Sequence, residues 1–315
     1  MMGALLVHTE VLNRAPRVPA PGRAFGCGHV LEVFRLATAS GHLTDEPLTH
    51  RRDAWWVFPL FTFLAYSAFV VYATYRVMEP TLTGIPFAEY GHYYTADNGN
   101  YHYLSPFGTP DLTFLVPTFL HSVPFLGELA RSPAFVILPF PALFRFTCYY
   151  YRKSYYRSFV ARPAGCAVPA AKGIDYRGEK GLLILQNVHR YFLYAAIVIT
   201  FFLAYDALRS IITPHGLYFG FGSAYMLLNV VLLTGYTFGC HSFRHLIGGK
   251  LDCFSCDDDN KPRTRYNLWA RVTVLNGRHG TWAWLSLFTV ATTDIYIRWL
   301  AANPDITHLF GVIPV

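Results

Sequence analysis

Four long apolar stretches constrain the fold of this chain more than any other feature. None has more than one charged residue; they are Ala54 to Tyr75, Tyr191 to Tyr205 with the apolar run before it, Ile211 to Phe243, and Thr281 to Ile297. A helix needs about 20 mostly apolar residues to cross a membrane with its backbone polar groups satisfied internally. The sequence therefore predicts an all-α integral membrane helical bundle.

Two further apolar segments are broken by proline. Ser132 to Tyr151 contains three prolines and Arg145, so we expect a span with an irregular entry and a regular second half. Leu112 to Ala130 contains Pro117 and Pro124, and we expect it to be re-entrant or to lie on the membrane surface. The sequence thus predicts about five transmembrane helices, near residues 54–77, 131–157, 183–207, 218–246 and 280–300.

The positions of the basic residues predict the orientation. Of the 26 Lys and Arg, 22 lie in three stretches, residues 1–53, 145–190 and 244–278. Cytoplasmic loops of membrane proteins carry such an excess of Lys and Arg. We therefore expect a cytoplasmic N-terminal arm over residues 1–50, an anchor domain over 51–302 and an outer tail over 303–315. The basic charge then marks membrane sidedness, and no nucleic acid is expected as a partner. The N-terminus lacks the basic start of a secretory signal.

Cysteine and histidine residues gather at one predicted depth, where the apolar spans meet the cytoplasm. The candidates for metal ligands are Cys148, Cys166, Cys240, His189, His241 and His245. Each one alone also fits a duller role, as a small core residue or as a histidine at a helix end. Together they form the ligand set of a metal centre, and disulfides are disfavoured in a reducing compartment. Zinc, a Rieske-type [2Fe–2S] cluster and a bis-histidine haem b remain open from the residues alone.

The pair Cys253 and Cys256 forms a CxxC motif without a second CxxC. It is a weak zinc signal, and the acidic residues that follow it favour a solvated loop.

Five motifs in order resemble one known family. They are FRFTCYYYRKSYYRSF, AGCAV, LILQNVHRYFLY, LLTGYTFGCHSFRHLIGGKL and LNGRHGTWAWLSL, and the resemblance covers roughly residues 50 to 300. The family is the membrane-anchor subunit of the actinobacterial-type succinate dehydrogenase with a membrane-embedded Rieske-type cluster. The chain departs from the family at Phe243, where a second Cys often stands.

The resemblance implies a subunit of succinate:quinone oxidoreductase in the bacterial cytoplasmic membrane. Such an anchor docks a flavoprotein and an iron–sulfur subunit on its cytoplasmic face and passes electrons to a quinone, either menaquinone or ubiquinone. The implied cluster ligands are two Cys and two His among the six candidates above. A haem b anchor of a fumarate reductase or another respiratory complex is the alternative, and a transporter is a more remote one.

A quinone head group requires an apolar slot with hydrogen-bond donors near its two carbonyls. Side chains at the predicted inner interface can supply both. The candidates are Arg145, Tyr149, Arg152, Arg190, Arg244 and Trp284.

Overall fold

The computed structural model describes residues 53–83, 93–95, 102–110, 112–124, 126–130, 132–161, 164–168, 181–213, 216–249, 263–303 and 313–314. The predicted N-terminal arm, the CxxC pair and most of the predicted outer tail lie outside the described residues.

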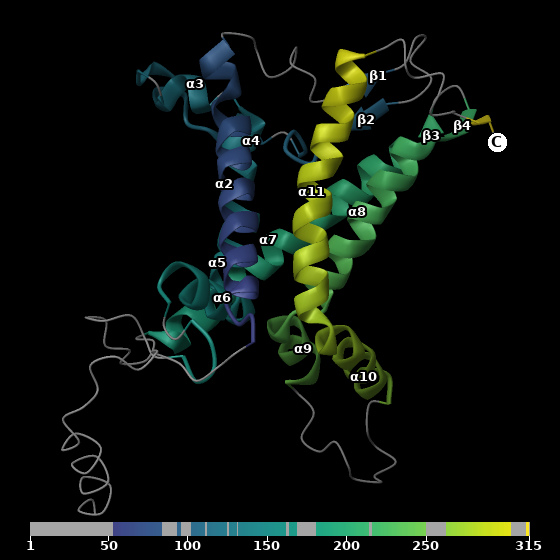
Figure 1. Ribbon diagram of the computed structural model, residues 1–315. Helices are drawn as coiled ribbons and strands as arrows, with labels where there is room; N and C mark the ends of the chain where they lie inside the picture. The colour runs from purple at the N-terminus through teal and green to yellow at the C-terminus, as the bar shows by residue number, and fades with distance from the viewer. Residues whose placement is uncertain are drawn as a thin grey trace, which may run out of the picture. The chain divides into compact units, whose positions relative to one another are not determined.

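Long helices dominate the described residues (Figure 1). They are α2 (Val57–Thr83), α7 (Leu182–Arg209), α8 (Phe221–Phe238) and α11 (His279–Ala302). Three segments among the described residues are long and apolar enough to cross a membrane, namely Val57–Glu79, Leu183–Arg209 and Phe221–Phe238. Helix α11 has 24 residues, but its second half carries Asp294 and Arg298. The mostly helical fold that the sequence predicts is confirmed, whereas the count of five spans and the orientation stay predictions.

The segment around residues 131–157 differs from its prediction. It forms three helices, α4 (Pro133–Ile137), α5 (Pro139–Thr147) and α6 (Tyr149–Phe159). Prolines stand at the start of α4 and α5, where a missing N–H costs nothing. Cys148 is extended (φ −66°, ψ 126°) and separates α5 from α6. The expected regular second half is therefore wrong, because the helix ends at the cysteine.

A second break falls inside the predicted span 218–246. Helix α8 ends at Phe238, Cys240 is extended (φ −64°, ψ 142°), and α9 (His241–Gly248) begins directly after it. The single helix that the sequence predicts through this cysteine is thus replaced by two. Helix α10 (Arg263–Gly277) then leads into α11.

Short elements lie between the long helices. The segment from Leu112 forms two 3-10 turns, η4 (Thr113–Leu115) and η5 (Thr118–Ser122), and then α3 (Leu126–Ala130), all too short to cross a membrane. Strands β1 (Tyr93–Thr95) and β2 (His102–Leu104) pair antiparallel. Strands β3 (Ile212–Thr213), β4 (Gly216–Phe219) and β5 (Ile313–Pro314) form a second antiparallel sheet in that order.

Helices α5, α6, α9 and α10 gather at the ends of the bundle where α2 and α11 begin (Figure 1). By the charge pattern this is the predicted cytoplasmic end. One buried cluster there joins α2, α5, α6, α7, α8 and α11, and it includes both Cys148 and Cys240. The two thiols therefore lie in the packed interior.

Candidate metal centre and adjoining cavity

Two thiols and two imidazoles meet at the predicted cytoplasmic end of the bundle. His189 Nε2 lies 3.1 Å from Cys240 Sγ, and His279 Nε2 lies 3.6 Å from Cys148 Sγ. The two thiols are close enough to interact electrostatically, and so are the two imidazoles. Cys148, Cys240 and His189 are 5 %, 1 % and 3 % exposed. Four residues from distant parts of the chain thus form one donor set, in which Cys148, Cys240 and His189 are buried and His279 is half-buried.

Both cysteines stand at the N-cap position of a short helix, α6 for Cys148 and α9 for Cys240. First-turn N–H groups interact with each sulfur, from Tyr150 and Tyr151 in one case and from Ser242 and Phe243 in the other. Free N–H groups at a helix N-terminus favour negative charge. The two helix breaks therefore place each sulfur at the N-terminus of a helix.

The hydrogen bonds of His189 orient its other ring nitrogen. Thr147 Oγ1 donates to Leu143 O at 2.7 Å, so its lone pair accepts the proton of His189 Nδ1 at 2.8 Å. Nε2 then keeps its lone pair and points toward Cys240. A partner that fixes the tautomer in this way is typical of metal-binding histidines.

Aromatic rings hold both imidazoles in place. The Phe144 ring stacks on His189 with centroids 4.7 Å apart, and the Tyr236 ring stacks on His279 with centroids 5.0 Å apart. The interplanar angles are 6° and 15°. Packing of this kind limits ring rotation, so both Nε2 atoms stay directed at the thiols.

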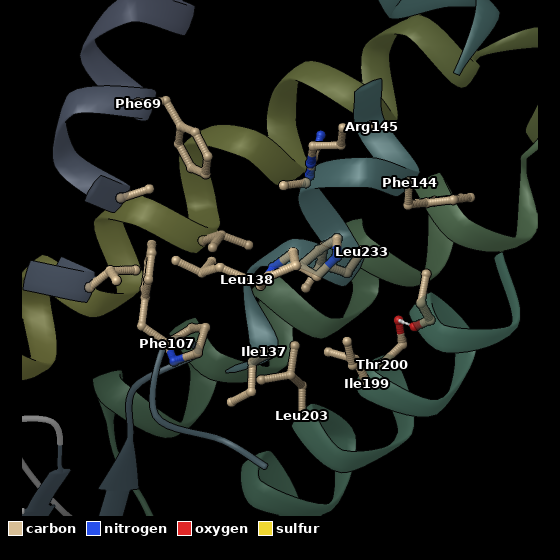
Figure 2. A pocket seen from close by; sticks show the side chains of 18 of the residues that line it. Phe69, Phe107, Ile137, Leu138, Phe144, Arg145, Ile199, Thr200, Leu203 and Leu233 are labelled. Carbon is tan, nitrogen blue, oxygen red and sulfur yellow. Dashed lines mark hydrogen bonds between the residues drawn. The ribbon is translucent and has the colours of Figure 1, made fainter. Parts of the chain in front are cut away.

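A cavity of about 370 Å³ adjoins this donor set (Figure 2). Its walls come from α2, α4, α5, α7, α8 and α11, and nearly all of them are apolar. Figure 2 shows Arg145 at one side of the cavity, and it shows Phe107 and Leu203 on the side away from Arg145. Tyr236 also lines the cavity. The cavity thus joins a large apolar space to a polar corner made of Arg145 and Tyr236.

The sequence matches, over residues 57–303, the family described as actinobacterial succinate dehydrogenase subunit SdhC. The chain belongs to this family. Among solved structures it is similar to the Mycobacterium smegmatis Sdh1 complex in the apo form, with 37 % sequence identity and a TM-score of 0.63 over 84 % of this chain and 94 % of that chain. None of the curated proteins matches it. This SdhC family member is therefore a membrane subunit of a succinate dehydrogenase and acts within an oxidoreductase complex with other Sdh subunits.

The remaining predicted ligands of this SdhC chain lie outside the donor set. Cys166 is exposed in a turn between α6 and α7. His245 is exposed on α9, and its Nδ1 lies 3.2 Å from Arg190 Nη2. His241 is also exposed, although it is near enough to interact electrostatically with His189 and His279.

Reasoning from the sequence missed His279. It is the first residue of α11, within the motif LNGRHGTWAWLSL. A span predicted to start at residue 280 places this histidine at the same depth as the other candidates. That depth is the signal that could have identified it.

Of the six predicted quinone contacts, Arg145 is the one that lines the cavity of about 370 Å³. Trp284 lines a separate depression with Tyr150 and His279 at the start of α11. The guanidinium of Arg152 donates to Thr147 O at 2.6 Å and lies 5.9 Å from the centre of the exposed Tyr149 ring. Arg190 is exposed beside His245, and Arg244 lies over the Trp269 ring at 4.6 Å.

Proposed function

We propose that this SdhC family member is the quinone-reactive anchor of its complex and holds a Rieske-type [2Fe–2S] cluster on Cys148, His189, Cys240 and His279. The observation that carries the proposal is the meeting of two buried thiols with two imidazole Nε2 atoms. A Rieske cluster is bound by two cysteines on one iron and two histidines on the other. When bound, the cluster would accept electrons singly and release them singly.

The donor set fits two irons better than one metal ion. Within the part of the chain that the structure describes, no three His, Cys, Asp or Glu side chains are arranged to hold a single ion. In a Rieske cluster each iron takes only two protein ligands. The two cysteines and two histidines of the donor set match these ligands in kind and number.

The surroundings of the two histidines support a cluster over haem b. A bis-histidine haem needs two imidazoles that face a flat slot from opposite sides. The Nε2 atoms of His189 and His279 instead face thiols. Membership of the SdhC family argues against a transporter.

The cavity beside the donor set supports a quinone site. Its apolar walls suit a quinone ring and the start of an isoprenoid tail, whether from menaquinone or from ubiquinone. Arg145 and Tyr236 line one corner of the cavity and give it polar character next to the apolar walls.

The topology completes the proposal. We place the N-terminus and the α6, α9 and α10 end of the bundle on the cytoplasmic side of the bacterial membrane, with about five spans. Helix α6 carries Arg152, Lys153 and Arg157, and α10 carries Arg265 and Arg271. The flavoprotein and iron–sulfur subunits would dock against this basic end, which brings the electron donor close to Cys148 and His279.

The test is a measurement of iron, acid-labile sulfide and the EPR spectrum on the purified complex. Cys240→Ala and His279→Ala should each abolish the Rieske-type signal, while succinate oxidation with an artificial acceptor continues at the flavin. The matched controls Cys166→Ala and His245→Ala change the same residue types at exposed positions and should retain the signal. A signal that persists in both Cys240→Ala and His279→Ala would exclude this ligand set, and haem bands in the visible spectrum would favour the haem alternative.

A further inference from the structure

Arg145 is a buried cation that no carboxylate neutralises among the described residues. Its guanidinium donates to Tyr151 Oη at 2.5 Å, to Ala283 O at 2.9 Å and to Ser286 Oγ at 2.8 Å. All three acceptors are neutral, and the residue is only 9 % exposed. A charge in the interior of a membrane protein is costly and is usually paired. A negative charge near Arg145 would therefore be stabilising, and the side chains described around it do not supply one.

The guanidinium lies close to the proposed cluster ligands. Its Cζ is 4.5 Å from the centre of the Tyr236 ring, and that ring stacks on His279 with centroids 5.0 Å apart. The two distances together place the guanidinium within about 9.5 Å of the His279 ring. Cys148 is the residue that ends the same helix, α5, and it interacts electrostatically with Arg145. One aromatic ring thus separates the cation from the donor set.

A Rieske-type cluster becomes more negative when it is reduced, and a nearby cation would favour that change. With two ferric ions, two sulfides, two thiolates and two neutral imidazoles, the oxidised centre is neutral. An added electron makes it negative. The effective dielectric constant between buried groups is far below that of water, so a cation at this range lowers the energy of the reduced form.

We propose that Arg145 is the resident counter-charge for the electron held by the Cys148, His189, Cys240 and His279 centre, and that it raises the reduction potential of that centre. The inference rests on the proposed function. The electron comes from the iron–sulfur subunit of the complex, which is oxidised, and leaves to the quinone, which is reduced. Arg145 keeps its proton throughout. It acts on the centre through its charge and does not itself bind iron.

A purely structural role is the competing explanation, because the hydrogen bonds of Arg145 join α5 to α11. A structural role predicts loss of stability without a change of potential. A measurement of the reduction potential of the centre therefore distinguishes the two roles, whereas a measurement of activity does not.

The experiment is an EPR redox titration of the Rieske-type signal in the purified complex. Arg145→Gln keeps hydrogen-bond donors and removes the charge, and we expect at least a tenfold shift toward the oxidised form at a given potential. For one electron, tenfold corresponds to a midpoint 59 mV more negative. Arg145→Lys keeps the charge and should stay near the parent value. Arg209→Gln is the matched control, since Arg209 is exposed at the opposite end of α7 from His189, and its midpoint should not change.

Three outcomes would overturn the inference. An unchanged midpoint in Arg145→Gln with an intact signal would refute the counter-charge and leave the proposed function standing. Loss of the signal from both Arg145→Gln and Arg145→Lys would assign the arginine to assembly of the centre instead. Absence of a Rieske-type signal from the parent complex would refute both proposals together.

Discussion

A buried ionic network lies near the ends of α2 and α11, far from the candidate metal centre. It offers a prediction that does not depend on any cofactor. Asp294 accepts hydrogen bonds from Arg76 Nε at 2.8 Å and Nη2 at 3.2 Å, and also from Tyr72 and Ser105. Glu79 accepts from Arg76 and, at 2.6 Å from each terminal nitrogen, from Arg298. Arg76 and Asp294 are each 0 % exposed. Two arginines and two carboxylates thus balance in charge, and all but the partly exposed Arg298 are buried.

Asp294→Asn should unbalance this network with little change in volume. The amide leaves Arg76 and Arg298 to share the single carboxylate of Glu79, and it points a donor at other donors. Two unit charges about 4 Å apart interact by about 4 kcal/mol at an effective dielectric constant of about 20. Breaking a buried pair from one side typically costs about 3–5 kcal/mol. We therefore expect a loss of about 3–5 kcal/mol, which corresponds to a fall in Tm of about 5–8 °C for a chain of 315 residues.

Thermal melting of the purified complex in detergent would measure this loss. Thr293→Val is the matched control, because the neighbouring Thr293 is 1 % exposed and its hydroxyl has no partner among the described residues. That variant should be neutral or stabilising. The double variant Arg76→Met, Asp294→Leu should recover most of the loss, since it removes both charges. A loss below about 1 kcal/mol in Asp294→Asn, or additive losses in the double variant, would refute the reasoning.

Two further predictions concern packing and the bilayer. Gly235→Ala places a Cβ 2.7 Å from the Trp282 ring and should destabilise the protein by about 1–3 kcal/mol, measured in a thermal melt. In the control Gly277→Ala the Cβ meets nothing within 4 Å, and the stability should not change. Equal Tm values for the two variants would contradict the close α8–α11 contact. The segment around Phe119 is uncharged, and that side chain is 67 % exposed, so a photoreactive benzoylphenylalanine at Phe119 should form adducts with phospholipid, while the same group at the buried Phe107 should form none. Adducts of the Phe119 variant with protein alone would show that this segment packs against a subunit instead.

The sequence predicts the long helices because the physics of the bilayer is local. A run such as Val57–Glu79 shows its length and polarity directly, and no tertiary contact is needed to identify it. The depth at which cysteines and histidines gather follows from the same runs. For this reason the amino-acid sequence alone is enough to make Cys148, His189 and Cys240 candidate ligands.

The helix breaks at Cys148 and Cys240 do not follow from the sequence. Neither cysteine is next to a proline, and both lie within helical patterns that continue on either side. The backbone turns there because tertiary packing places each sulfur at the start of a new helix. Because helical periodicity assumes a continuous helix through Cys240, the ligand pairs could not be assigned from it. The choice of His279 over His241 and His245 depends on the same tertiary packing.

Comparison of the two ends of the bundle explains why one set of buried charges suggests structure and the other suggests function. The Arg76, Glu79, Asp294 and Arg298 network contains its own counter-ions, so its formal charge is balanced whatever binds elsewhere. Arg145 has only neutral acceptors among the described residues, and it borders both a cavity and a set of thiols and imidazoles. The same chain thus pairs its buried arginines with carboxylates in the network at one end of the bundle, but not at Arg145. The unbalanced arginine is therefore best explained by a negative charge that arrives during turnover, as an electron does.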